Sequence, residues 1–341
     1  MFATPPAVTL PHGARVLIVR LSALGDVLFA LETVASLKAE RPDVAVDFLV
    51  EDRFADLLAG HPQLAAVRTV PRRGGAAWVR AALALRRTRY DAVLDLHGIL
   101  KSGVQVWLAR AGRKVGYAPP GAREGAHLLY RERVALPAPL PHRADRGYAL
   151  LRALGLRGAP ARPVLAPPDR APDFWDGHDG RRVVLHPGTS AFAAFKRWPA
   201  AKFAALAQRL RARGTAPVVS HGPGERDLAA AIAAQAGGLR LLDGGRLGLR
   251  GLGAVYAQAD VVVAADTGPL HVAAAAGTSV VALFGPKDPA LYGPRTPRQR
   301  VLFAAVPCRP CRRRTCPSPQ CVLALDVDDV ERAVLDLLAR R

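Results

Sequence analysis

The chain has 341 residues, 50% of them hydrophobic, and a formal net charge of +20. This length is typical of about two domains, each with enough apolar residues for a sizeable core. No apolar run approaches the roughly 20 residues that cross a bilayer, and the first residues lack the charged start and apolar stretch of a signal peptide. We therefore expect a cytoplasmic protein without a membrane-spanning segment.

Positive charge is concentrated locally. The segment from Arg68 to Arg89 contains seven arginines and no acidic residue. A charge of this size concerns partners rather than fold, and it suits nucleic acid, an anionic membrane or a phosphorylated substrate. The alternative explanation is that genome bias makes the protein rich in alanine and arginine, but the clustering of the arginines favours an anion-facing surface.

Apolar patterning predicts alternating strands and helices in the first half of the chain. The run RVLIVR is short and β-branched, as in a buried strand, and the helix-periodic stretch that follows stops at Pro42. The same reasoning predicts strands at 15–20, 44–50, 67–70 and 91–96 and helices at 27–41, 52–59, 78–89 and 100–110.

The second half repeats this alternation after a segment rich in Pro, Gly and Asp at 158–180, which we expect to link two domains. Strands are predicted at 182–186, 216–220, 239–242, 260–264 and 279–284, and helices at 200–213, 227–236, 249–257, 269–276 and 328–339. Alternation of this kind indicates βαβ units and mostly parallel sheets. The predicted fold is α/β, with two doubly wound, Rossmann-like domains that face a central cleft and bind ligands beyond the carboxyl ends of their strands.

The loop after the first predicted strand carries a candidate catalytic carboxylate. In LSALGD, Gly25 allows close backbone approach and Asp26 falls in the first turn of a helix. Two interpretations fit: Asp26 is a general base aimed into the cleft, or it merely caps the helix. The loop does not read G-x-G-x-x-G, so a dinucleotide-binding fingerprint is not supported.

A second loop suits a pyrophosphate. It contains Thr189 and Ser190 in the run HPGTS, and Lys196 follows just before a helix. Small hydroxylated residues with free backbone N–H groups, together with a lysine, are typical of phosphate-binding loops. An ordinary turn beside a solvated lysine is the alternative.

Two further loops of the second half carry candidate sugar-binding acids. Glu225 is placed either to accept hydrogen bonds from ribose hydroxyls or to favour a helix N terminus. In the run DTGPLH, Thr267 and Gly268 offer hydroxyl and backbone N–H groups to an anion, and Asp266 is free for sugar hydroxyls. A capped helix with a satisfied His271 is the alternative.

All the cysteines of the chain lie close together in the sequence, with the spacing C-x2-C-x4-C-x4-C: Cys308, Cys311, Cys316 and Cys321. Four thiolates can bind zinc or iron tetrahedrally, and clustering favours metal over disulfides in a cytosolic protein. Such a metal would be structural. Free thiols and disulfides are the alternatives.

Several ordered motifs together resemble one family. They read RVLIVRLSALGDVLFALE, YDAVLDLHGILKS, GYAPPGAREGAHLLYRERV, LHPGTSAFAAFKRWP and DTGPLHVAAAAGTSVVALFGPKDP. From about Arg15 to its last helix the chain resembles the ADP-heptose:lipopolysaccharide heptosyltransferases, which are inverting enzymes with the GT-B fold. The segments DLHGILKS and AREGAHLLY look most like heptosyltransferase I, whereas the tail CRPCRRRTCPSPQC looks more like heptosyltransferase II and related members.

The resemblance implies a domain for each substrate. Residues 14–165 correspond to the acceptor-binding domain, 166–325 to the nucleotide-sugar-binding domain, and 326–341 to a closing helix. Asp26 matches the proposed catalytic base, and Lys196 matches a residue that stabilises the leaving group. The donor-binding positions are Thr189, Ser190, Lys196, Glu225, Asp266, Thr267, Gly268 and His271. Basic residues expected at the acceptor are Lys101 and Arg123, to which the arginine-rich segment adds Arg72 and Arg73.

The implied reaction transfers heptose from ADP-heptose to the Kdo of Kdo–lipid A or to another inner-core lipopolysaccharide acceptor. No cofactor is needed for catalysis, because lysine and helix N termini carry the charge of the departing ADP. The acceptor is anionic and sits in the inner membrane, so we expect peripheral association with that surface. A family member with another acceptor or nucleotide sugar is the nearest alternative.

A basic nucleic-acid-binding module is the alternative from another functional class. Against it, the chain shows no helix-turn-helix signature, only 6% aromatic residues for base stacking, and a cysteine spacing unlike a zinc finger. We therefore expect no nucleic-acid partner.

Overall fold

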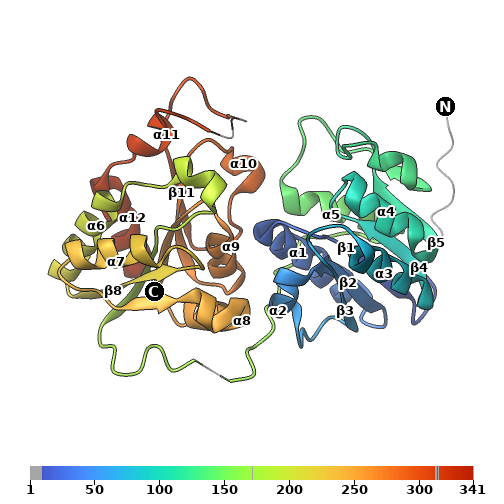
Figure 1. Ribbon diagram of the computed structural model, residues 1–341, viewed down its shortest axis with the longest axis horizontal. Coiled ribbons are helices and arrows are strands. Elements are labelled where there is room, and N and C mark those ends of the chain that lie inside the picture. The colour runs from blue at the N-terminus through green and yellow to red at the C-terminus, as the bar shows by residue number, and fades with distance from the viewer. Residues whose placement is uncertain (1–9, 171, 312, 314, 341) are drawn as a thin grey trace. The chain divides into compact units, whose positions relative to one another are not determined.

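A computed structural model describes residues 10–170, 172–311, 313 and 315–340 (Figure 1). Residues 1–9, on which part of the signal-peptide interpretation rests, lie outside this set. The chain divides into two compact units between Ala166 and Pro167. Within the described ranges, no helix combines the length and apolarity needed to span a membrane.

The first unit is built on a six-stranded parallel sheet with the order β3-β2-β1-β4-β5-β6. The register pairs Val16 of β1 with Val46 of β2 on one side and with Ala92 of β4 on the other. The strands are β1 (Arg15–Val19), β2 (Ala45–Glu51), β3 (Ala66–Val70), β4 (Arg89–Asp95), β5 (Arg110–Tyr117) and β6 (Glu132–Val134).

Helices connect these strands, as parallel pairing requires. They are α1 (Leu24–Glu40), α2 (Ala55–Leu58), α3 (Ala76–Ala84), α4 (Leu100–Leu108) and α5 (Arg143–Ala153). Short 3-10 turns occupy Asp52–Phe54, Leu85–Arg87 and Ala126–Leu129. The central strand β1 is buried along Val16–Val19, which explains its nearly continuous apolar sequence.

The second unit repeats this topology with the sheet order β12-β11-β10-β7-β8-β9. Its strands are β7 (Arg181–His186), β8 (Thr215–His221), β9 (Leu241–Asp243), β10 (Val261–Ala265), β11 (Ser279–Phe284) and β12 (Gln299–Phe303). Its helices are α6 (Ala200–Ala212), α7 (Arg226–Gln235), α8 (Gly244–Ala257), α9 (Gly268–Ala275), α10 (Pro289–Tyr292), α11 (Gln320–Leu323) and α12 (Val327–Ala339), and a 3-10 segment covers Ala191–Lys196.

The last helix belongs to the core of this second unit. Val334 and Leu337 of α12 are buried in the same cluster as Phe203 and Leu206 of α6. At the surface, Glu331 of α12 pairs with arginines of α6 and of the turn that follows it. Helix α12 therefore closes one face of the second sheet.

Both sheets reverse their strand order next to their first strand. In the first unit the reversal lies between β1 and β4, and in the second between β7 and β10. Doubly wound sheets bind ligands at such reversal points, beyond the carboxyl ends of the strands. The loops that follow these four strands are therefore the places to look for function.

Candidate active site

Asp26 lies in the first turn of α1, just beyond the carboxyl end of β1. Arg20, which immediately follows β1, forms an ion pair with it through Nη2 and Oδ2. Arg143 at the start of α5 lies with Nε 3.9 Å from Oδ1. Two arginines from different elements thus converge on this carboxylate, so its interactions go beyond those of a helix-capping residue.

A small pocket lies beside Asp26 in the first unit. Its lining combines cationic, hydroxyl and apolar side chains: Arg20, Asp26, Phe29, Ala30, Thr33, Leu96, Tyr117, Arg143 and Arg146. Three arginines against one carboxylate leave the pocket positively charged. Such a pocket suits an anionic ligand that presents a hydroxyl group to Asp26.

The surroundings of Asp26 keep it ionised. Burial by itself raises the pKa of this carboxyl, but Arg20, Arg143 and other nearby groups lower it, and the net result is a pKa below the ordinary aspartate value. Burial and the same arginines lower the pKa of His97 to about 2, so this histidine is neutral at physiological pH. Asp26 is therefore a carboxylate, able to accept a proton.

Arg20 is itself held in place. It is 4% exposed, and its Nη1 donates a hydrogen bond of 2.5 Å to the carbonyl oxygen of Leu96, just after β4. Arg20 thus ties the two strand ends at the reversal point to Asp26. Arg20 was not predicted as a site residue, although a charged residue at the end of the apolar run RVLIVR is the signal that points to it.

The residues predicted to bind the acceptor lie outside the lining of this pocket. Lys101 donates from Nζ to Glu51 Oε1 at 3.0 Å and to the carbonyl oxygen of Arg72 at 2.7 Å. Arg72 and Arg73 are exposed, and so is Arg123, whose backbone N–H donates to Gly98 O at 2.8 Å. The structure brings Lys101 and Arg72 together.

In the second unit, Lys196 and Asp266 form an ion pair of 2.8 Å. They come from opposite sides of the reversal point, since Lys196 follows β7 and Asp266 follows β10. His271 of α9 lies with Nε2 4.0 Å from the other oxygen of Asp266. Three predicted donor-site residues are therefore neighbours, although Lys196 and Asp266 lie 70 positions apart in the sequence.

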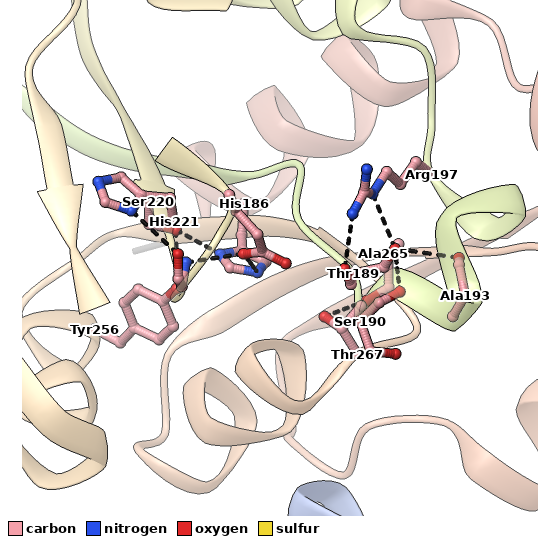
Figure 2. A network of polar contacts seen from close by, with 12 residues as sticks. His186, Thr189, Ser190, Ala193, Arg197, Ser220, His221, Tyr256, Ala265 and Thr267 are labelled. Atoms are coloured by element: carbon pink, nitrogen blue, oxygen red, sulfur yellow. Dashed lines mark hydrogen bonds and ion pairs between the residues drawn. The ribbon is translucent and has the colours of Figure 1, made fainter. Parts of the chain in front are cut away.

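Helix α9 begins at the predicted anion site. Thr267 is its N-cap residue and Gly268 its first residue. The Thr267 hydroxyl donates to the carbonyl oxygen of Ala265 at 3.1 Å (Figure 2), rather than capping the helix with its side chain. The first N–H groups of α9 and the positive end of its dipole remain suited to a phosphate.

Thr189 contributes to the loop in a different way from the one predicted. Its side chain is buried, donates to Ala193 O at 3.1 Å and accepts from Arg197 Nε at 3.0 Å (Figure 2). Arg197 also donates to the carbonyl oxygen of Thr189 at 2.9 Å. The hydroxyl therefore organises the loop, while the neighbouring Ser190 is exposed.

Glu225 lies beside the HPGTS loop. Its Oε2 accepts from the backbone N–H of Gly222 at 2.8 Å and lies 3.9 Å from Nε2 of His186. A Cβ atom on Gly188 would meet this carboxylate at 2.0 Å, so only glycine leaves room for it. His186 was not predicted as a site residue, because a histidine at the end of a strand looks like part of the core.

The metal site predicted at the cysteines stays a prediction. Within the described part of the chain, no three His, Cys, Asp or Glu side chains form a group that could hold a metal ion. All four cysteines, Cys308, Cys311, Cys316 and Cys321, are free thiols. Their environments differ, since Cys308 is exposed while Cys321 is buried against Gly285, and a tetrahedral site needs all four sulfurs at one point.

Comparison with known proteins gives the same family over most of the chain. The profile of glycosyltransferase family 9 (heptosyltransferase) matches residues 78–322. Lipopolysaccharide heptosyltransferase 1 of Pseudomonas aeruginosa is 32% identical over 335 residues, covering 89% of this chain and 87% of the relative. Lipopolysaccharide heptosyltransferase 1 of Escherichia coli K12 is 29% identical, covering 81% and 89%.

Solved structures agree with the fold. The family 9 glycosyl transferase from Veillonella parvula superposes with a TM-score of 0.84 at 19% identity, covering 98% of this chain and 99% of that one. Escherichia coli heptosyltransferase WaaC with ADP superposes with a TM-score of 0.77 at 26% identity, covering 95% and 99%. The topology, the charged groups at the strand ends and these likenesses lead to one conclusion. This chain belongs to glycosyltransferase family 9, the heptosyltransferase family.

Proposed function

We propose that this protein is an inverting heptosyltransferase that transfers heptose from ADP-heptose to the Kdo of Kdo–lipid A. The observation that carries the proposal is the ionised Asp26 among arginines at the strand-order reversal of the first unit. The likeness to heptosyltransferase 1, and to a WaaC structure that contains ADP, supports the choice of donor and acceptor.

The proposed step is a single displacement. The acceptor hydroxyl oxygen forms a bond to the anomeric carbon of heptose while the bond from that carbon to the ADP phosphate oxygen breaks. Because the two oxygens lie on opposite faces of the sugar, the anomeric configuration inverts. The hydroxyl proton passes to Asp26, and the negative charge departs with ADP.

Asp26 suits the role of base through its two unequal oxygens. Arg20 holds Oδ2 in an ion pair, whereas Oδ1 has Arg143 only at 3.9 Å. We assign Oδ1 as the atom that accepts the proton. Arg143 and Arg146 of the pocket then face the anionic groups of the acceptor.

The departing diphosphate is assigned to the second unit. Lys196 carries three N–H donors and uses one on Asp266, so it can donate others to a phosphate without breaking that ion pair. The N terminus of α9 and the HPGTS loop with Ser190 supply backbone N–H groups. Asp266 and His271 are assigned to the heptose hydroxyls, and Glu225 to the ribose.

We also propose that the first unit docks peripherally on the cytoplasmic face of the inner membrane. Trp107 at the end of α4 is 58% exposed, and Val79 and Leu83 form an exposed apolar stripe one turn apart on α3, which contacts α4. The exposed Arg72 and Arg73 precede α3. Apolar groups flanked by arginines suit an acidic lipid surface.

The test is a transfer assay with two acceptors. Purified protein is incubated with ADP-heptose and either Kdo–lipid A or the same lipid already carrying one heptose. The masses of the products are then measured by mass spectrometry. We expect Kdo–lipid A alone to gain the mass of one heptose. Transfer only to the heptosylated lipid would replace the proposal with a heptosyltransferase II activity, and no transfer to either would refute it.

A further inference from the structure

A chain of buried polar groups links Tyr256, Ser220 and His186 in the second unit (Figure 2). Tyr256 of α8 lies with its hydroxyl 3.0 Å from Ser220 Oγ at the end of β8. Ser220 Oγ lies in turn 2.9 Å from Nδ1 of His186 at the end of β7. Tyr256, Ser220 and His186 are 0%, 1% and 3% exposed, so water does not compete for these hydrogen bonds.

The direction of the hydrogen bonds follows from the chemistry of the two ends. A buried phenol must donate its proton, and within the described residues the acceptor at Tyr256 is Ser220 Oγ. The Ser220 hydroxyl then donates its own proton to His186, so Nδ1 is the acceptor. A neutral imidazole with a lone pair on Nδ1 carries its proton on Nε2.

The imidazole is neutral under physiological conditions. Burial and, to a smaller extent, the neighbouring His221 lower the pKa of His186 to about 4. The opposite nitrogen, Nε2, faces Glu225, whose Oε2 lies 3.9 Å away. The reverse tautomer would turn a lone pair toward that carboxylate, so the chain from Tyr256 decides whether this contact attracts or repels.

Glu225 is therefore constrained on three sides. The N–H of Gly222 donates to Oε2, the ring of His186 faces the same oxygen, and the carboxylate fills the space that a Cβ on Gly188 would take. The side chain of Glu225 is 14% exposed, so its carboxylate can still be reached by a ligand. A carboxylate held this way can accept hydrogen bonds from two vicinal hydroxyls.

We propose that His186 is a positioning residue for the nucleotide ribose: the Tyr256–Ser220 chain fixes its proton on Nε2, and this N–H orients Glu225 to receive the ribose hydroxyls. The inference rests on the proposed assignment of the donor to this unit. It adds residues from β7, β8 and α8 that do not contact the nucleotide themselves but control how strongly the site binds the ribose hydroxyls.

The test compares two amide variants of the full-length protein. In His186→Gln the amide N–H takes the place of Nε2–H, whereas in His186→Asn the amide oxygen takes the place of Nδ1 as the acceptor for Ser220 and no N–H reaches toward Glu225. Calorimetry measures the affinity of each protein for ADP and for 2′,3′-dideoxy-ADP, which lacks the ribose hydroxyls. His178→Asn is the matched control, because His178 is a partly buried histidine of the same unit whose ring nitrogen hydrogen-bonds to the carbonyl oxygen of Ala216, away from Glu225.

We expect the wild type and His178→Asn to prefer ADP over the dideoxy compound by about tenfold or more. His186→Asn should lose most of that preference through weaker ADP binding, with dideoxy-ADP bound as before, and His186→Gln should recover part of it. Heteronuclear NMR should show the Nε2–H tautomer of His186 in the wild type, and a mixture of tautomers in Ser220→Ala.

Two results would overturn the inference in distinguishable ways. If the wild type prefers ADP but His186→Asn keeps the full preference, His186 does not act through Glu225, and the proposed function stands. If the wild type binds neither nucleotide, the donor assignment itself is wrong and the inference falls with it. Equal loss of both nucleotides in His186→Asn and His186→Gln would mean that His186 has only a structural role.

Discussion

Asp26 combines two properties that oppose each other in a general base. Its arginine partners lower its pKa and keep it ionised, but a lower pKa also makes a carboxylate a weaker proton acceptor. The pairing with Arg20 through one oxygen resolves part of this conflict, because Arg20 stabilises the charge at Oδ2 while Arg143 lies 3.9 Å from Oδ1. Asp26 has to accept the proton only as the new glycosidic bond forms, and at that stage the acceptor hydroxyl has become more acidic.

The pH profile of kcat/KM should report this pairing. Replacement of Arg20 by Met removes a cation from Asp26, so the pKa of the carboxyl rises and a larger fraction is protonated at any given acidic pH. We expect the acid limb of the profile to move up by about one pH unit or more in Arg20→Met, and by less in Arg20→Lys, which keeps the charge. If the acid limb stays in place in a variant with a normal melting temperature, the limb does not report the titration of Asp26.

Single residues were predictable where chemistry and position coincide. Asp26, Lys196 and Asp266 are polar residues just after apolar strands, and such positions lie at the functional edge of a parallel sheet. Arg143 was not predictable in this way, because it starts a helix more than a hundred residues after Asp26 and only the folded chain brings the two together. The same holds for Tyr256, which looks like an ordinary core aromatic.

At the scale of elements, the loops after β7 and β8 pack closely against each other at Gly188. Gly188 has no side chain, and the carboxylate of Glu225 occupies the space where a Cβ would lie. The Glu225 carboxylate is the end of a flexible side chain, so it can move away at small cost to folding. Gly188 thus contributes to the site by its size rather than by any hydrogen bond.

We expect Gly188→Ala to displace Glu225 and weaken donor binding about tenfold, with the melting temperature nearly unchanged. The measurement is KM for ADP-heptose together with thermal unfolding. Gly74→Ala serves as the control, because a Cβ there meets nothing within 4 Å. Normal KM in Gly188→Ala would show that the position of Glu225 does not matter for the donor.

The secondary structure was predictable wherever apolar residues repeat with a clear period. The structure confirms strands and helices at the predicted positions in both halves, with boundaries that shift by a few residues. Strands β5, β6 and β12 and helix α5 were missed. β5 (RAGRKVGY) begins with charged residues and is buried only at its end, and β12 is a half-exposed edge strand, so neither shows a continuous apolar run.

The cysteine-rich tail shows what spacing alone leaves open. Spacing alone suggested a tetrahedral metal site, but spacing says nothing about where each sulfur points. In the structure the thiols of Cys308 and Cys321 differ in exposure, and the backbone N–H of Cys311 donates to Pro286 O at 2.8 Å. Local backbone contacts of this kind cannot be predicted from cysteine counts.

At the scale of the whole molecule, the same strand order occurs twice and each unit carries a different part of the chemistry. The first unit holds the carboxylate and its arginines, and the second holds the lysine, the helix N terminus and Glu225, the acid that we assign to the ribose. The chain also carries a net charge of +20. This charge strengthens encounter with anionic acceptors and lipids, and salt screens the effect.

Vesicle binding should depend on where the positive charge lies. We expect the double variant Arg72→Gln, Arg73→Gln to bind vesicles of phosphatidylglycerol and phosphatidylcholine roughly 30-fold more weakly, since each basic residue near the surface contributes about 1 kcal/mol. Arg157→Gln with Arg162→Gln removes the same charge from other exposed positions and should bind normally. Equal losses in both pairs, measured by sedimentation, would mean that net charge alone drives binding.

The division of labour between the two units makes Asp26→Asn the most direct test of the account. Single-turnover transfer from ADP-heptose to Kdo–lipid A is measured beside calorimetric binding of ADP to the same protein. We predict that the variant binds ADP like the wild type and transfers heptose roughly 100-fold more slowly or worse. Near-normal transfer by Asp26→Asn would contradict the assignment of Asp26 as the base.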